Sequence, residues 1–144
     1  MSFNRIPLKH RHLWGDRRAT LLIADSDPDV VHSLIQMTPP DLFRIQEVSD
    51  PADLCERLRW FDVVMVVVDV DILKRNKNLR DHLEFRSRLG VPVIVTGSGL
   101  DPADEALARG LGCVLYAPKP CGHWMLHEAV KGLLCQGASG PSQS

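Results

Sequence analysis

The chain lacks a long apolar run. Its longest uninterrupted apolar stretch, Val63 to Val68, is far shorter than the roughly 18 residues that a membrane span requires. The N-terminal region also lacks the apolar segment of a signal peptide, because charged residues stand where that segment would be. We therefore expect a cytoplasmic protein with no membrane partner.

Cysteines are few, and none of them form a Cys-x-x-Cys pair. The four cysteines are Cys55, Cys113, Cys121 and Cys135. The chain is longer than secreted domains held together by disulfides, so we interpret these residues as reduced thiols. His123 and His127 lie near two of them in the sequence. A metal site built from these histidines with Cys113 and Cys121 is an alternative, but the spacing matches no familiar zinc pattern.

The composition is that of a soluble globular domain, with 44% apolar and 24% charged residues in 144. The net charge of −1 is unevenly distributed, because residues 1–18 hold five basic side chains and one acidic side chain. We expect a basic N-terminal extension over residues 1–18, one domain over 19–135 and a flexible tail over 136–144. The extension could touch nucleic acid, a membrane surface or an acidic partner, or it could simply be solvated.

Three Asp-Pro pairs mark the expected starts of helices, at residues 27–28, 50–51 and 101–102. Asp is a favoured N-cap, and Pro is favoured at the first helical position. Each pair follows a short β-rich run, and two more such runs occur in the chain. The five expected strands are Leu21 to Ala24, Phe43 to Val48, Asp62 to Val68, Val93 to Thr96 and Cys113 to Ala117.

The expected helices alternate with these strands. Apolar spacing indicates a last helix from about Trp124 to Leu134, and the helix before the fourth strand is expected from about Leu79 to Leu89. Continuous Val and Ile runs are typical of strands that are buried on both faces of a parallel sheet. We therefore predict an α/β fold, a flavodoxin-like doubly wound five-stranded parallel sheet in the order 2-1-3-4-5 with helices on both faces.

Three residues that can do chemistry follow the ends of three expected strands. Asp25 follows the first strand, Asp69 the third, and Lys119 the fifth. Ligands bind at the carboxyl ends of the strands in such sheets, so we expect these three side chains to converge. A carboxylate can accept a phosphoryl group if a lysine and Mg²⁺ offset the charge on the transferring oxygens. The sequence thus predicts an aspartyl phosphoacceptor site.

The order and spacing of these signals resemble the receiver domain of bacterial response regulators, the chemotaxis-regulator-like domain of two-component signalling, over most of the chain. The resemblance implies that Asp69 is the phosphoacceptor, that Asp25 helps to hold Mg²⁺ and that Lys119 binds the phosphoryl group. It also implies a metal contact from the backbone carbonyl of Asp71, whose side chain adds a further oxygen ligand.

Three departures from the receiver pattern occur: Leu73 and Cys121, which affect loop rigidity more than chemistry, form one, and the other two bear on the chemistry. Ser26 stands where the family usually carries the second member of an acidic pair that binds Mg²⁺, and Asp27 could compensate unless it caps the following helix. Gly97 stands at the switch position, where the family carries a Ser or Thr hydroxyl. Thr96 or Ser98 could supply that hydroxyl to the phosphoryl group only if the strand is locally re-aimed by a bulge or a turn.

Two further features bear on how such a domain would signal. Tyr116 matches the aromatic switch position, whose ring turns inward in the phosphorylated state; alternatively, it covers the edge of the core with its hydroxyl in water. The last strand and helix, including His123, Trp124 and His127, could support a homodimer, as in many receivers. Alternatively, Trp124 is a half-buried packing residue.

We expect a single-domain response-regulator receiver in a phosphorelay, and not an enzyme. A histidine kinase or phosphotransfer protein would phosphorylate Asp69. The short segment after Lys119 leaves output to contacts with a downstream protein, unless the chain is part of a longer protein. The alternative is a degenerate receiver that acts as a phosphorylation-independent docking module. Ser26 and Gly97 favour that alternative, whereas the retained Asp25, Asp69 and Lys119 favour phosphorylation.

Two other functions are weakly indicated. The segment from Val66 to Asp71 also resembles the DxD opening of haloacid-dehalogenase-type phosphohydrolases, but that family needs an acidic pair after its lysine, and only Glu128 follows Lys119. The body of the chain is acidic and has no helix-turn-helix segment, which argues against nucleic-acid binding by the domain itself.

Overall fold

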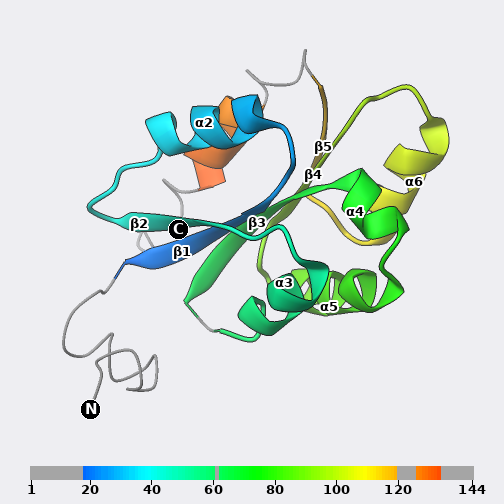
Figure 1. Ribbon diagram of the computed structural model, residues 1–144, viewed down its shortest axis with the longest axis horizontal. Helices are drawn as coiled ribbons and strands as arrows, with labels where there is room; N and C mark the ends of the chain where they lie inside the picture. The colour runs from blue at the N-terminus through cyan, green and yellow to red at the C-terminus, as the bar shows by residue number, and fades with distance from the viewer. Residues whose placement is uncertain (1–17, 61, 120–125, 134–144) are drawn as a thin grey trace, which may run out of the picture.

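The computed structural model describes residues 18–60, 62–119 and 126–133. Within these residues, five parallel strands form one sheet in the order β2-β1-β3-β4-β5 (Figure 1). The strands are β1 (Ala19–Ala24), β2 (Phe43–Glu47), β3 (Val63–Asp69), β4 (Val93–Gly97) and β5 (Leu115–Pro118). The predicted fold class, strand order and strand positions are confirmed.

Helices connect the strands on both faces of the sheet. They are α2 (Pro28–Met37), α3 (Pro51–Arg57), α4 (Val70–Lys74), α5 (Lys77–Arg88) and α6 (Pro102–Gly110), and residues 126–133 are also helical. The three Asp-Pro pairs begin α2, α3 and α6 as predicted. The side chains of Asp27, Asp50 and Asp101 each accept a hydrogen bond from the backbone N–H two residues later, which is the geometry of an N-cap.

The sequence prediction was incomplete between β3 and β4. The helix expected from about Leu79 to Leu89 is present as α5, Lys77–Arg88, but α4 directly after β3 was not predicted. Asp69 caps α4, because its carboxylate accepts the N–H of Asp71. The last residue of β3 is therefore also the residue that starts a helix.

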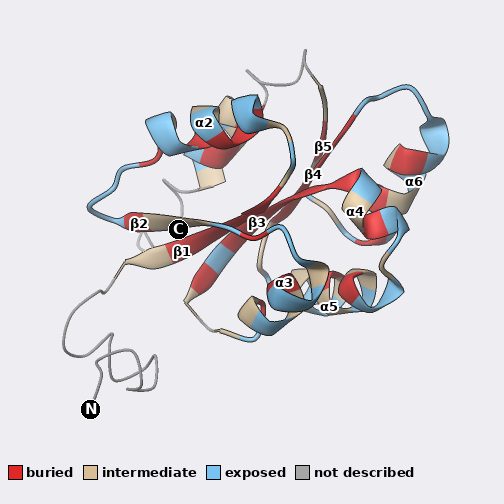
Figure 2. Cartoon of the chain, viewed as in Figure 1, coloured by how far each residue is buried: buried red, intermediate tan, exposed pale blue. Residues whose placement is uncertain are grey.

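Two apolar clusters lie on opposite faces of the sheet. Figure 2 shows that the central strands between them are largely buried. Residues of α2 and of the helix at 126–133 pack on one face, where the cluster includes Leu21, Ile23, Leu34, Met65, Val67, Ile94, Leu126 and Val130. Residues of α3, α4, α5 and α6 pack on the other face, where it includes Leu22, Leu54, Val66, Val68, Leu73, Leu83, Val95 and Ala108. Alternate residues of β1, β3 and β4 thus enter opposite clusters, which explains their continuous apolar runs.

Several expectations fall outside the described residues. They concern the basic extension up to residue 17, the tail at 136–144, and the surface that includes His123 and Trp124. Cys121 and Cys135 also lie there. Across the described ranges, none of the helices combines the length and the apolar character that crossing a bilayer would need.

Candidate functional site

The carboxyl edge of the sheet brings three predicted residues together. Asp25 directly follows β1, Asp69 ends β3, and Lys119 directly follows β5. The ammonium nitrogen of Lys119 lies 2.7 Å from Oδ1 of Asp25 and 3.0 Å from Oδ2 of Asp69. The expected convergence is therefore confirmed, and one lysine bridges the two carboxylates.

The Asp25 side chain is completely buried and is surrounded by donors. Its exposed fraction is 0%. Besides the Lys119 ammonium, Oδ1 accepts the backbone N–H of Asp27 at 2.9 Å, and Oδ2 accepts the Thr96 hydroxyl at 2.5 Å. A buried carboxylate without such partners would be strongly destabilising. These three donors therefore satisfy the oxygens of the buried Asp25 side chain at the base of the site.

Asp69 is held in a similar way but lies nearer to solvent. Its side chain is 9% exposed. Oδ1 accepts the N–H of Asp71 at 2.9 Å, while Oδ2 accepts from Lys119. The carboxylate is thus fixed at the end of β3 by two charge-compensating contacts.

Lys119 remains a cation in this environment. Burial by itself lowers its pKa, but the hydrogen bonds to Asp25 and Asp69 outweigh that effect and raise the pKa above the ordinary 10.5. The ammonium group is therefore charged at neutral pH. It can offset negative charge that develops on either carboxylate.

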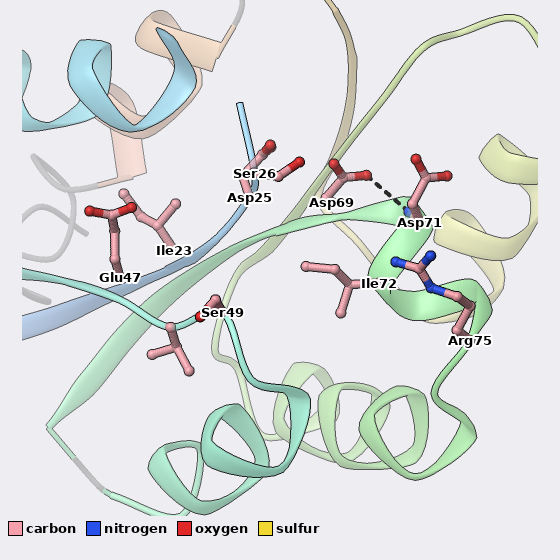
Figure 3. Close-up of a pocket in the computed structure, with 10 residues that line it drawn as sticks. Ile23, Asp25, Ser26, Glu47, Ser49, Asp69, Asp71, Ile72 and Arg75 are labelled. Carbon is pink, nitrogen blue, oxygen red and sulfur yellow. Dashed lines mark hydrogen bonds between the residues drawn. The ribbon is translucent and has the colours of Figure 1, made fainter. Parts of the chain in front are cut away.

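A surface pocket of about 460 Å³ opens beside these residues (Figure 3). Its polar lining includes Asp25, Ser26, Glu47, Asp69, Asp71 and Arg75. The side chains of Asp25, Ser26 and Asp69 lie next to one another at one end of the pocket in Figure 3, while Arg75 extends from the end of α4 on the other side. The site is thus open enough for a small phosphorylated group to approach Asp69.

The oxygen atoms at this edge, as they are arranged, do not form a suitable set of ligands for a Mg²⁺ ion. Asp25 is fully occupied by protein donors, and Asp27 is committed to the N–H of Asp29 at 2.9 Å as a helix cap. Ser26 supplies a neutral hydroxyl in place of a carboxylate. The Asp71 side chain is 68% exposed and lies 3.9 Å from the Lys74 ammonium.

Mg²⁺ prefers about six oxygen ligands in near-octahedral geometry, and protein sites usually supply one or two carboxylates that are free to coordinate. No cluster of three or more His, Cys, Asp or Glu side chains able to hold a metal occurs in the part of the chain that the structure describes. The replacement of an acidic residue by Ser26 accounts for this, because it removes both a ligand and a charge.

The hydroxyl candidates near Gly97 are directed elsewhere. β4 pairs with both of its neighbours without a bulge. The Thr96 hydroxyl reaches Asp25, and the Ser98 hydroxyl oxygen accepts the N–H of Leu100 at 3.3 Å. Regular strand alternation, with no local re-aiming, therefore sets the direction of Thr96.

Tyr116 lies inward. It is 6% exposed and belongs to the apolar cluster formed with α3 to α6. Burial raises the pKa of its hydroxyl, an effect that the nearby Gly99 backbone partly offsets. The interpretation that placed this hydroxyl in water is therefore wrong.

Two other features of the site were not predicted from the sequence. Lys74 at the end of α4 forms an ion pair at 3.2 Å with Asp104 of α6, whose side chain is only 7% exposed. Arg75 reaches the pocket from the end of the same helix. Both depend on α4, and five residues are too few for a helical period to be recognised in a sequence.

Comparison with known proteins gives relatives in sequence and in fold. No protein-family model matches the chain. The chain is 28% identical over 117 residues to the regulatory protein VirG of Agrobacterium fabrum (strain C58 / ATCC 33970), and 26% identical over 115 residues to VirG of Rhizobium radiobacter. These alignments cover 81% and 79% of this chain but 42% and 39% of the relatives, so the chain spans about two fifths of their length.

Solved structures of receiver domains have the same fold. A response regulator receiver protein from Pseudoalteromonas atlantica is 17% identical with a TM-score of 0.65, covering 82% of this chain and 98% of that one. A CheY-like receiver domain from Methanospirillum hungatei JF-1 is also 17% identical, with a TM-score of 0.62 and coverage of 85% and 99%. The chain therefore has the fold of response-regulator receiver domains, and its sequence is similar to part of VirG.

Proposed function

We propose that this chain is a phosphoacceptor in two-component signalling, which receives a phosphoryl group on Asp69 and acts through protein contacts. The observation that carries the proposal is the bridge from Lys119 to Asp25 and Asp69 at the edge of an open pocket. A lysine held between two carboxylates is suited to a site where negative charge increases. Simple docking would not require this arrangement.

The chemistry follows from the positions of these groups. A carboxylate oxygen of Asp69 attacks the phosphorus of a donor, forming an O–P bond while the bond from phosphorus to the donor breaks. From a phosphohistidine, the departing imidazole takes up a proton; from acetyl phosphate, acetate leaves. The product is an acyl phosphate, and Lys119 offsets the charge that it brings. Because the chain itself is modified, it acts as a signalling acceptor and not as a catalyst of turnover.

The partners follow from the same chemistry. The donor would be a histidine kinase or a phosphotransfer protein, and a downstream protein would recognise the phosphorylated form. A cytoplasmic location would give the chain access to both. Homodimerisation through the last strand and helix stays a prediction, since much of that surface lies outside the described residues.

A phosphorylation-independent docking module is the second candidate function. The specific observation in its favour is that every oxygen of the Asp25 and Asp69 carboxylates already has a protein donor. Ser26, in place of an acidic residue, adds no further negative charge beside these two carboxylates. Such a site would hold one conformation without any modification.

Phosphorylation with acetyl phosphate separates the two candidates. Wild type, Asp69→Ala and Asp71→Ala would be incubated with acetyl phosphate, with and without Mg²⁺, and their intact masses compared. We expect one added phosphoryl group on wild type and on Asp71→Ala, and none on Asp69→Ala. Asp71 is the matched control, because its exposed carboxylate lines the same pocket.

The Mg²⁺ arm tests the cofactor that the resemblance implies. A phosphorylated form that requires Mg²⁺ would show that the donor groups rearrange to bind the ion. Equal phosphorylation with and without Mg²⁺ would agree with the finding that the oxygen atoms of this site do not suit the ion. If wild type stays unmodified under all conditions while remaining folded, the docking function would replace the phosphoacceptor function.

A further inference from the structure

Gly97 and Tyr116 occupy one space at the carboxyl edge of the sheet. A Cβ atom built on Gly97 would lie 2.3 Å from the Tyr116 hydroxyl oxygen and 3.0 Å from Cζ of its ring. The hydroxyl of Tyr116 therefore stands within the volume that a side chain at position 97 would fill. The inward position of this ring and the glycine at 97 require each other.

This hydroxyl is buried and has no partner. Tyr116 is 6% exposed, and its Oη atom is an unsatisfied buried polar atom among the described residues. The Gly99 backbone lies near the hydroxyl oxygen and lowers the pKa that burial raises, while none of the described groups accepts the hydroxyl hydrogen. A buried hydroxyl without a partner costs stability, so its retention calls for an explanation.

Its surroundings belong to the phosphoacceptor site. The hypothetical Cβ at Gly97 would also lie 3.0 Å from Cγ1 of Val70, the residue that follows Asp69. The carbonyl of Gly97 accepts the backbone N–H of Lys119 at 2.6 Å. The Tyr116 hydroxyl therefore lies against Gly97, whose own neighbours are the residue after Asp69 and the backbone of Lys119.

The other hydroxyls on this side of the site are already engaged. Thr96 donates to Asp25, and Ser98 accepts from Leu100 at an exposed position. Of the hydroxyl groups on β4, β5 and the loop after β4, Tyr116 alone is both buried and unpartnered within the described ranges.

We propose that the Tyr116 hydroxyl is a hydrogen-bond donor to the phosphoryl group on Asp69, in the place of the side-chain hydroxyl that Gly97 lacks. This inference rests on the proposed phosphoacceptor function. A phosphoryl group adds three acceptor oxygens beyond the Asp69 carboxylate, and one of them would satisfy the buried phenol. Gly97 has the role of leaving room for the ring.

The experiment uses the full chain and beryllofluoride as a probe of the phosphorylated state. Wild type, Tyr116→Phe, and the double variant Gly97→Ser with Tyr116→Phe would be compared for beryllofluoride affinity and for the lifetime of the acyl phosphate. Phenylalanine removes only the oxygen. Serine at 97 then restores a hydroxyl in the vacated space, with shifts of a few tenths of an ångström by the ring and by the Val70 side chain.

We expect Tyr116→Phe to bind beryllofluoride about 10- to 100-fold more weakly, the range for loss of a hydrogen bond to a charged group. The double variant should recover at least half of that loss on a logarithmic scale. Because the chain has one tyrosine, a ¹⁹F label on that residue would report its environment without ambiguity. Its signal in otherwise wild-type protein should shift when beryllofluoride binds.

Unchanged affinity and lifetime in folded Tyr116→Phe, while wild type binds normally, would overturn this inference and leave the proposed function intact. A loss that the added serine does not recover would also overturn it, since packing of the ring would then be responsible. If wild type itself forms neither adduct nor phosphorylated form, the proposed function fails, and the inference fails with it.

Discussion

At the scale of single residues, Lys119 dominates the electrostatics of the site. It forms ion pairs with two carboxylates, one of which has no exposure to solvent. Removing it would leave the buried Asp25 with only the Thr96 hydroxyl and a backbone N–H as donors. Loss of one partner from a buried ion pair is strongly destabilising.

We predict that Lys119→Met lowers the free energy of unfolding by about 1 to 3 kcal/mol at neutral pH, a range reduced for the partial solvation of the lysine. Because the pKa of Lys119 is raised on folding, its contribution is complete below the pKa of an unfolded lysine, about 10.4. It is lost as the pH rises through the still higher pKa of the folded state.

Urea unfolding of wild type and Lys119→Met at about pH 8 and about pH 11 would measure this difference. Groups that both proteins share, including Tyr116, contribute equally to both free energies of unfolding, so their titration cancels in the difference between the two proteins. This difference in free energy of unfolding should be smaller at the higher pH. A gap that stays constant or widens would show that the charge of Lys119 does not supply its stabilising effect.

The sequence predicted the positions of these charged residues better than the directions of their neighbours. Asp25, Asp69 and Lys119 each follow a strand, so the strand order alone is enough to bring them together. Strand alternation sets the direction of Thr96, but the inward position of Tyr116 depends on packing across β4 and β5. The missing Cβ of Gly97 leaves room for the inward ring, and no local pattern reveals that.

At the scale of helices and strands, Asp27 is part of both the N-cap of α2 and the hydrogen bonding of the site. Its side chain accepts the N–H of Asp29, and its own N–H donates to Asp25. We predict that Asp27→Ala lowers the free energy of unfolding by about 1 kcal/mol, the usual cost of losing an N-cap. Phosphorylation of Asp69 should persist, because the backbone N–H remains.

Denaturation and acetyl phosphate assays on the same preparations would check both parts of this prediction. Asp27→Asn is the matched control, since its side-chain oxygen can still cap α2, and it should retain wild-type stability within a few tenths of a kcal/mol. A phosphorylation defect in both variants, with stability unchanged, would instead assign Asp27 to metal binding.

The caps also show which elements a sequence can predict. An Asp-Pro pair after a β-rich run signals its helix locally, and all three such helices were predicted at the correct residue. The helix α4 has an Asp cap too, but the same residue ends β3 and lies within an apolar run that reads as strand. Its start could not be separated from the strand that precedes it.

At the scale of the whole molecule, the sheet joins the two apolar clusters. Successive residues of β1 and of β3 enter opposite clusters, so neither cluster can be disrupted without moving strands that the other one needs. The alternation of strands and helices predicted this layered arrangement, because only helices on both faces can cover strands that are apolar throughout. The packing partners of each helix were beyond such a prediction.

We predict that Leu34→Ala, on the α2 face, and Leu83→Ala, on the α5 face, each lower the free energy of unfolding by about 2 to 5 kcal/mol. Both side chains are fully buried. Ile35→Ala is the control, because the Ile35 side chain is 51% exposed and its truncation should lower the free energy of unfolding by less than about 0.5 kcal/mol.

Each variant should still unfold in one transition, with far-UV circular dichroism and tryptophan fluorescence changing together. Separate transitions in either leucine variant would mean that one face of the sheet can unfold alone, and that the carboxyl edge with Asp25, Asp69 and Lys119 is not held by the fold as a single unit.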